Sequence, residues 1–137
     1  MGRFSVEIEL CNNRDLVLAE EGKIGQDQVR RAKIRGVVDT GATRLVLPKG
    51  VVRHLGLEEK GKVGVRYADG RRAIRPVVDN VYVHLLGRSS VFKAVVEARR
   101  VSALIGAFVL EDLDLMVDPT RERLLPRDPR YMISYAE

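Results

Sequence analysis

The tripeptide Asp39-Thr40-Gly41 places a carboxylate between two apolar stretches, Val37-Val38 before it and Leu45-Val46-Leu47 after it. Burying an isolated ionised carboxylate is very costly, so an aspartate at this place in a chain requires a physical reason. A threonine hydroxyl can lock a loop, and a glycine lets backbone approach the carboxyl closely. An ordinary turn, in which the aspartate bonds to its own backbone, is the alternative. The pattern therefore predicts a tight loop with Asp39 as the candidate functional group.

Length and composition predict one folded domain. A chain of 137 residues can bury one core but not two lobes, and 45% apolar with 31% charged residues is typical of a folded protein. No apolar stretch approaches the roughly 20 residues of a membrane span, and the N-terminus shows no signal-peptide pattern. The single cysteine, Cys11, excludes an intrachain disulfide. We therefore expect a cytoplasmic protein with a domain at 1–126 and a mobile tail at 127–137.

Short segments in which apolar and polar residues alternate predict a fold made mostly of strands. Asp69-Gly70 adds a strong hairpin signal between two of these segments. Strands are predicted at residues 4–10, 32–38, 63–67, 71–78, 81–85, 91–96, 115–117 and 124–125.

Helices are expected to be few and short. Pro48 and Gly56 bracket one, because proline is favoured in the first turn and glycine just past the last; a second is expected at about 107–113. Residues 11–15 are predicted to form a turn, and residues 16–28 have no assigned structure. Together, these predicted strands, turns and helices indicate an all-β fold, a closed or nearly closed barrel of short strands with one or two short helices.

Three segments in this order resemble the retropepsin-like aspartic proteases, the single-lobe group that includes retroviral proteases and many bacterial and archaeal relatives. The resemblance spans about residues 34–118 and implies the acid protease barrel. The matching segments are Val37-Val38-Asp39-Thr40-Gly41-Ala42-Thr43, then Tyr67-Ala68-Asp69-Gly70 at the place of the flap hairpin, then Ala103-Leu104-Ile105-Gly106 before a short helix.

The resemblance implies that Asp39 is the catalytic residue of a peptide-cleaving enzyme. This chemistry needs two carboxyl groups that share one proton, since two like charges about 3 Å apart cannot both ionise. The motif occurs once in this chain, so the resemblance also implies a two-fold homodimer in which each subunit supplies one Asp39. The expected partners are a second copy and a polypeptide substrate, and no cofactor is expected.

Roles for other residues follow from the same resemblance. Thr40 would bond across the dimer axis, Gly41 would admit substrate backbone, and Ala42 would leave room in the cleft. Thr43 stands where many family members carry an acidic residue, and the adjacent Arg44 could favour acidic side chains.

Two further elements are assigned by resemblance. The flap would consist of Tyr67, Ala68, Asp69, Gly70 and Arg71, which are more polar than a typical family flap; an ordinary surface hairpin is the alternative. Gly106 would pack against the catalytic loop. Ala107-Phe108 follows where many relatives have a polar residue that ties the helix to that loop.

Two other functions remain open. The departures at Thr43, in the flap and after Gly106 are compatible with a protein-interaction module that has weak or no proteolytic activity. The net charge of +5 and pI of about 9.7 are compatible with a nucleic-acid-binding barrel, but the arginines are dispersed and no aromatic residues are interleaved for base stacking. His54 and His84 lack neighbouring cysteines, so no metal site is expected.

Overall fold

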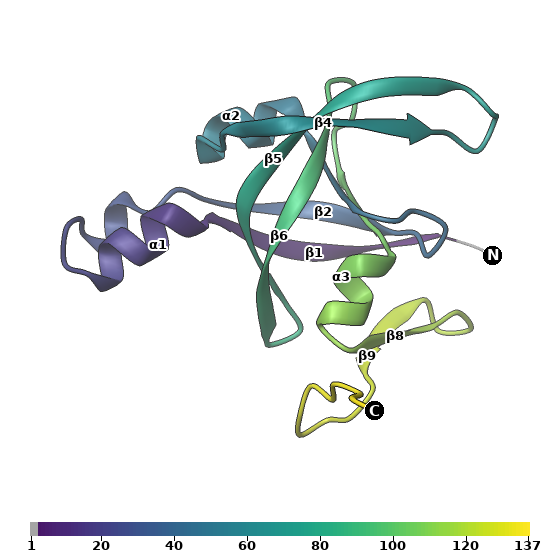
Figure 1. Cartoon of the computed structure of the whole chain (residues 1–137). Helices are drawn as coiled ribbons and strands as arrows, with labels where there is room; N and C mark the ends of the chain where they lie inside the picture. The colour runs from purple at the N-terminus through teal and green to yellow at the C-terminus, as the bar shows by residue number, and fades with distance from the viewer. Residues whose placement is uncertain (1–2) are drawn as a thin grey trace.

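A computed structural model of the chain describes residues 3–137 and shows a closed β-barrel (Figure 1). Six strands follow one another around the ring in the order β1-β2-β7-β3-β6-β5, and β5 pairs back onto β1. A seventh strand, β4, pairs with β5 outside this ring. These elements confirm the predicted all-β barrel. Their bounds are β1 Phe4–Asn12, β2 Arg31–Val38, β3 Leu45–Pro48, β4 Glu59–Arg66, β5 Arg72–Leu85, β6 Arg88–Glu97 and β7 Ala103–Ile105.

The helices are short, as predicted, but one of them lies where a turn was expected. The predicted helix after Pro48 is α2, Lys49–Leu55, which ends at Gly56 with a φ of 63°, and α3 spans Ala107–Asp112. The unpredicted helix is α1, Asn13–Glu20, and a 3-10 turn follows at Gln26–Gln28.

Asn12 explains why the predicted turn at residues 11–15 is wrong. Its side-chain oxygen accepts a hydrogen bond from the Asp15 amide at 3.1 Å, and its Nδ2 donates to the Leu55 carbonyl at 2.8 Å. Asn and Asp favour turns and helix N-caps by the same side-chain bonds to backbone. The long-range bond to Leu55 favours the cap here, and it cannot be read from local sequence.

β5 is one continuous strand where two were predicted. Its pairing with β6 shifts register between Val78 and Val81, and Asn80 has a φ of 61°. Such a bulge bends a strand and changes which neighbour it faces. The first half of β5 therefore pairs with β4, and the second half closes the ring against β1.

The barrel interior is one apolar cluster. The inward residues of the alternating strands are fully buried, as period-two patterning predicts. The same cluster extends under α3 to the two-stranded sheet of β8 (Leu115–Asp118) and β9 (Arg123–Pro126), both predicted. Its largest members include Ile8, Leu10, Leu45, Leu47, Val81, Val83 and Ile105.

The segment after β9 has no regular secondary structure but is held to the domain by hydrogen bonds. The Arg88 guanidinium donates to the carbonyls of Leu113 at 3.0 Å, Tyr131 at 3.1 Å and Asp128. The Ile133 amide donates to Asp114 Oδ2 at 2.9 Å. The described residues include no helix that is long and apolar enough to cross a membrane.

Replacing Asp15 with asparagine is expected to destabilise the fold by about 1–3 kcal/mol at neutral pH, the usual cost of losing a buried charged hydrogen bond. The Asp15 carboxylate is buried and accepts from Arg30 Nε at 2.8 Å and from Arg30 Nη2 and N at 3.0 Å each. These bonds, led by the side-chain bond from Arg30, lower the pKa of Asp15. The stabilisation is therefore present above the ordinary carboxyl range and is lost as pH falls through the lowered pKa.

Urea unfolding at neutral and acidic pH measures this effect. The difference between the wild type and the Asp15→Asn variant should shrink as the pH falls. Glu20→Gln changes an exposed carboxylate on the same helix and serves as the control. Equal destabilisation by both variants would contradict the assigned role of the Asp15–Arg30 pair.

Candidate active site

The loop that begins at Asp39 is fastened at its base by β7. β2 ends at Val38, and β7 runs parallel to it with Val38 opposite Ile105. The Asp39 amide donates to the Ile105 carbonyl at 3.1 Å. Within the loop, the Gly41 amide donates to Asp39 Oδ1 at 2.9 Å and the Ala42 amide donates to the Asp39 carbonyl at 3.1 Å. These bonds fix the direction of the carboxylate, whose side chain is 18% exposed.

Gly106 and the start of α3 fasten the other side of the loop. The Ala107 amide donates to the Ala42 carbonyl at 2.8 Å, and the Phe108 amide donates to the Thr43 carbonyl at 2.9 Å. A Cβ on Gly106 would lie 2.6 Å from the Arg44 carbonyl oxygen and 2.7 Å from the Ala42 carbonyl oxygen. Ala107 and Phe108 have no polar side chain to connect α3 to the loop, so their backbone amides make this connection instead.

Thr40, Gly41 and Thr43 are exposed, while Ala42 and Arg44 are partly buried. The Arg44 guanidinium lies 5.4 Å from the centre of the Phe108 ring, which is a cation–π distance. The predicted loop residues thus follow Asp39 in one loop, in which Thr40, Gly41 and Thr43 are exposed.

Arg3 is a neighbour of Asp39 that sequence reasoning missed. Its Nη2 lies 3.3 Å from Asp39 Oδ2, and its side chain is 62% exposed. The register of β1 against β2 explains the contact, because Phe4 faces Val38 and the next residues outward are Arg3 and Asp39. The only sequence signal for the contact between Arg3 and Asp39 is the antiparallel pairing of residues 4–10 with residues 32–38.

The predicted flap is the tip of the β4–β5 hairpin. The Tyr67 amide donates to the Arg71 carbonyl and the Gly70 amide to the Tyr67 carbonyl, each at 2.9 Å, and Gly70 has a φ of 89°. Asp69 accepts from the Arg71 amide at 3.0 Å. The hairpin extends beyond the barrel on the side where β2 ends, and so on the side of Asp39 (Figure 1).

Tyr67 anchors the base of this tip to β6. Its hydroxyl donates to Glu97 Oε2, and Arg75 Nε donates to Glu97 Oε1 at 2.8 Å. The Arg71 guanidinium lies 4.9 Å from the centre of the Tyr67 ring. Burial, followed by the bond to Glu97, raises the pKa of Tyr67, so this hydroxyl stays protonated at neutral pH. Of the predicted flap residues, Ala68, Asp69, Gly70 and Arg71 are therefore the exposed tip.

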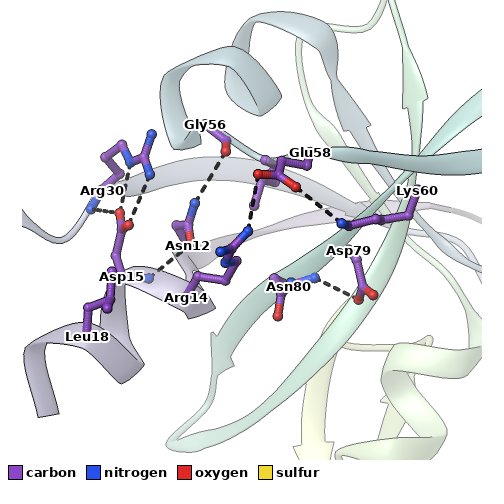
Figure 2. Close-up of a pocket in the computed structure, with 11 residues that line it drawn as sticks. Asn12, Arg14, Asp15, Leu18, Arg30, Gly56, Glu58, Lys60, Asp79 and Asn80 are labelled. Carbon is purple, nitrogen blue, oxygen red and sulfur yellow. Dashed lines mark hydrogen bonds and ion pairs between the residues drawn. The ribbon is translucent and has the colours of Figure 1, made fainter. Parts of the chain in front are cut away.

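A pocket of about 230 Å³ lies at the other end of β2, away from Asp39, and its charged side chains are largely paired with one another (Figure 2). Glu58 accepts hydrogen bonds from Arg14 and Lys60 at 3.2 Å each, and Asp15 accepts one from Arg30 Nε at 2.8 Å. Within residues 3–137, no group of three or more His, Cys, Asp or Glu side chains is arranged to hold a metal ion. The pocket is lined by Asn12, Arg14, Asp15, Leu18, Arg30, Gly56, Leu57, Glu58, Lys60, Asp79 and Asn80.

Comparison with known proteins agrees with this geometry. The family model described as "Aspartyl protease" matches residues 21–125. No curated protein matches the sequence. Among solved structures, the chain is similar to EIAV protease complexed with the inhibitor HBY-793, at 18% identity and a TM-score of 0.55, over 82% of this chain and 88% of that chain.

A second solved structure is that of Simian Foamy Virus (mac) protease, at 13% identity and a TM-score of 0.49, over 78% of this chain and 91% of that chain. The family match covers all three segments on which the sequence resemblance rests, and the EIAV protease supplies the matching fold. The chain therefore belongs to the aspartyl protease family and has the single-lobe fold of a retroviral protease.

Proposed function

We propose that this protein is a homodimeric, cofactor-free aspartic endopeptidase. The observation that carries the proposal is the loop at Asp39. Bonds from β7 and α3 hold it at both sides, and it presents one carboxylate at the surface. The proposed chemistry needs two carboxyl groups, and one chain supplies one of them. A second copy of the chain would therefore complete the site.

In the proposed mechanism, the two Asp39 carboxyl groups share one proton. The ionised group accepts a proton from water as the water attacks the scissile carbonyl, and the protonated group donates to the carbonyl oxygen. No covalent acyl intermediate forms. Because one proton is needed on the pair, activity should fall at both high and low pH.

The substrate would be an extended peptide bound between the subunits. Backbone hydrogen bonds would hold it in register, and alternate side chains would enter pockets. The tip at residues 68–71 would close over the peptide and exclude water. The bond from Tyr67 to Glu97 supports a hairpin whose base stays fixed while its tip moves.

The second candidate is a protein-interaction module with weak or no proteolysis. The ion pair between Arg3 and Asp39 favours it, because a positively charged side chain occupies one face of the carboxylate. The exposed Thr43 and the charged tip residues Asp69 and Arg71 also differ from the family pattern.

Cleavage of a diverse peptide library over a range of protein concentrations distinguishes the two candidates. A dimeric protease should show a specific activity that rises with concentration, in parallel with the dimer fraction measured by analytical ultracentrifugation. A dimer that forms and cleaves no peptide between pH 4 and 8 would favour the interaction module.

A further inference from the structure

Arg100 lies in the connection between β6 and β7, near enough to Asp39 for the two charges to interact. Its amide donates to the Glu97 carbonyl at 3.4 Å, and its side chain reaches forward to Ser102 and to Ala103, the first residue of β7. β7 also supplies the Ile105 carbonyl that holds Asp39. The Arg100 side chain is thus bonded to the start of the strand that holds the Asp39 loop.

The guanidinium of Arg100 is held by neutral oxygens alone. Nε donates to the Ser102 carbonyl at 2.9 Å, and Nη2 donates to Ser102 Oγ at 3.2 Å and to the Ala103 carbonyl at 3.4 Å. A guanidinium has five N–H donors, so these bonds use three and leave the two on Nη1. Among residues 3–137, no carboxylate lies within 4.0 Å of this side chain. The bonds therefore fix the orientation of the group while its charge stays unpaired.

The surroundings make this charge unusual. Arg100 is partly buried, and burial, followed by repulsion from Arg3, lowers its pKa from the ordinary arginine value. Asp39 and Glu97 are near enough to oppose that effect, but each is already paired, Asp39 with Arg3 and Glu97 with Arg75. A partly desolvated cation gains most from an anion that arrives from outside the subunit.

We propose that Arg100 determines specificity by binding an acidic side chain of the peptide substrate near the scissile bond. This inference rests on the proposed function and names the substrate class for that site, peptides that carry aspartate or glutamate close to the cleaved bond. The carboxylate accepts from the free Nη1 donors, while Ser102 and Ala103 hold the rest of the guanidinium. Charge-assisted bonds of this kind are short and strong, and a fixed guanidinium loses little freedom on forming them.

Peptide pools that are random except for glutamate or glutamine fixed at one position test the proposal. At one position or more near the cleaved bond, wild-type protein should cleave the glutamate pool about tenfold faster in kcat/KM than the glutamine pool, the factor expected for one charged hydrogen bond. In the Arg100→Gln variant, this ratio should fall to about one, with cleavage of the glutamine pool retained. Arg100→Lys, which keeps the charge but not the fork of donors, should give an intermediate ratio.

Arg53→Gln removes an exposed arginine on α2 and should leave the ratio unchanged. Equal cleavage of the two pools at every position by wild-type protein would overturn the role of Arg100 and leave the proposed protease activity standing. If wild-type protein cleaves no pool, the proposed function fails, and fluorescence anisotropy with the same pools, labelled with fluorescein, decides the role of Arg100. Tighter binding of the glutamate pool that is lost in Arg100→Gln would support the role of Arg100. Equal binding of the glutamate and glutamine pools by wild-type protein would overturn that role.

Discussion

Replacing Asp39 with asparagine is expected to reduce peptide cleavage by about 10³-fold, within the range of a positioned acid or base. The homodimer would lose both carboxyl groups at once, so neither proton acceptance from water nor proton donation to the scissile carbonyl remains. The side-chain oxygen of asparagine can still accept from the Gly41 amide, which bonds to Asp39 Oδ1 at 2.9 Å. The loop should therefore keep its shape while the chemistry stops.

Measured with the same peptide library, kcat/KM gives the loss in activity, and urea unfolding together with ultracentrifugation shows whether fold and dimer persist. Asp27→Asn makes the same chemical change at an exposed aspartate in the 3-10 turn and serves as the control. If both Asp39→Asn and Asp27→Asn retain wild-type activity, cleavage does not proceed through Asp39, and the proposed mechanism is wrong.

Replacing Gly106 with alanine is expected to destabilise the fold by about 3 kcal/mol, the upper part of the range for overpacking a tight site. The added Cβ would lie 2.6 Å from the Arg44 oxygen, 2.7 Å from the Ala42 oxygen and 2.9 Å from the Thr43 carbonyl carbon. All three atoms belong to the backbone, so no side-chain rotation relieves the contact. Either α3 or the Asp39 loop must move, and activity should fall together with stability.

Urea unfolding of Gly106→Ala and of Gly64→Ala provides a matched comparison. Gly64 lies on β4, and a Cβ there would meet no atom within 4 Å. Its replacement should change the free energy of unfolding by less than about 1 kcal/mol. Similar values for the two variants would show that the close approach of Gly106 to the loop contributes little to stability.

The sequence predicted most of the barrel, because most of its strands show a period-two pattern of apolar and polar residues. The short apolar strands β3 and β7 were not among the predicted strands. The hairpin at Asp69-Gly70 and the helix between Pro48 and Gly56 were also recoverable, since their residues act on their own neighbourhood. The importance of Asp39 and Gly106 came from a family resemblance. Local chemistry alone left Asp39 open to interpretation as a turn residue.

Features that depend on contacts between distant segments were missed. Helix α1 begins where Asn12 bonds to Leu55, more than forty residues along the chain. Arg3 meets Asp39 through strand pairing, and Tyr67 meets Glu97 across thirty residues. No periodicity or turn signal encodes such pairs, so one sequence cannot reveal them.

Closure of the barrel leaves the outer edge of β4 as the open side of the seven-stranded sheet. An open edge of unpaired amides and carbonyls invites strands of other molecules and is a common start of aggregation. β4 carries Lys60 and Lys62 there, and an irregular register at Glu59–Gly61 interrupts its pairing geometry. Lysines and bulges discourage indiscriminate strand addition. Some of the chain's excess positive charge therefore lies along this open strand edge, where it opposes the addition of a strand from another molecule.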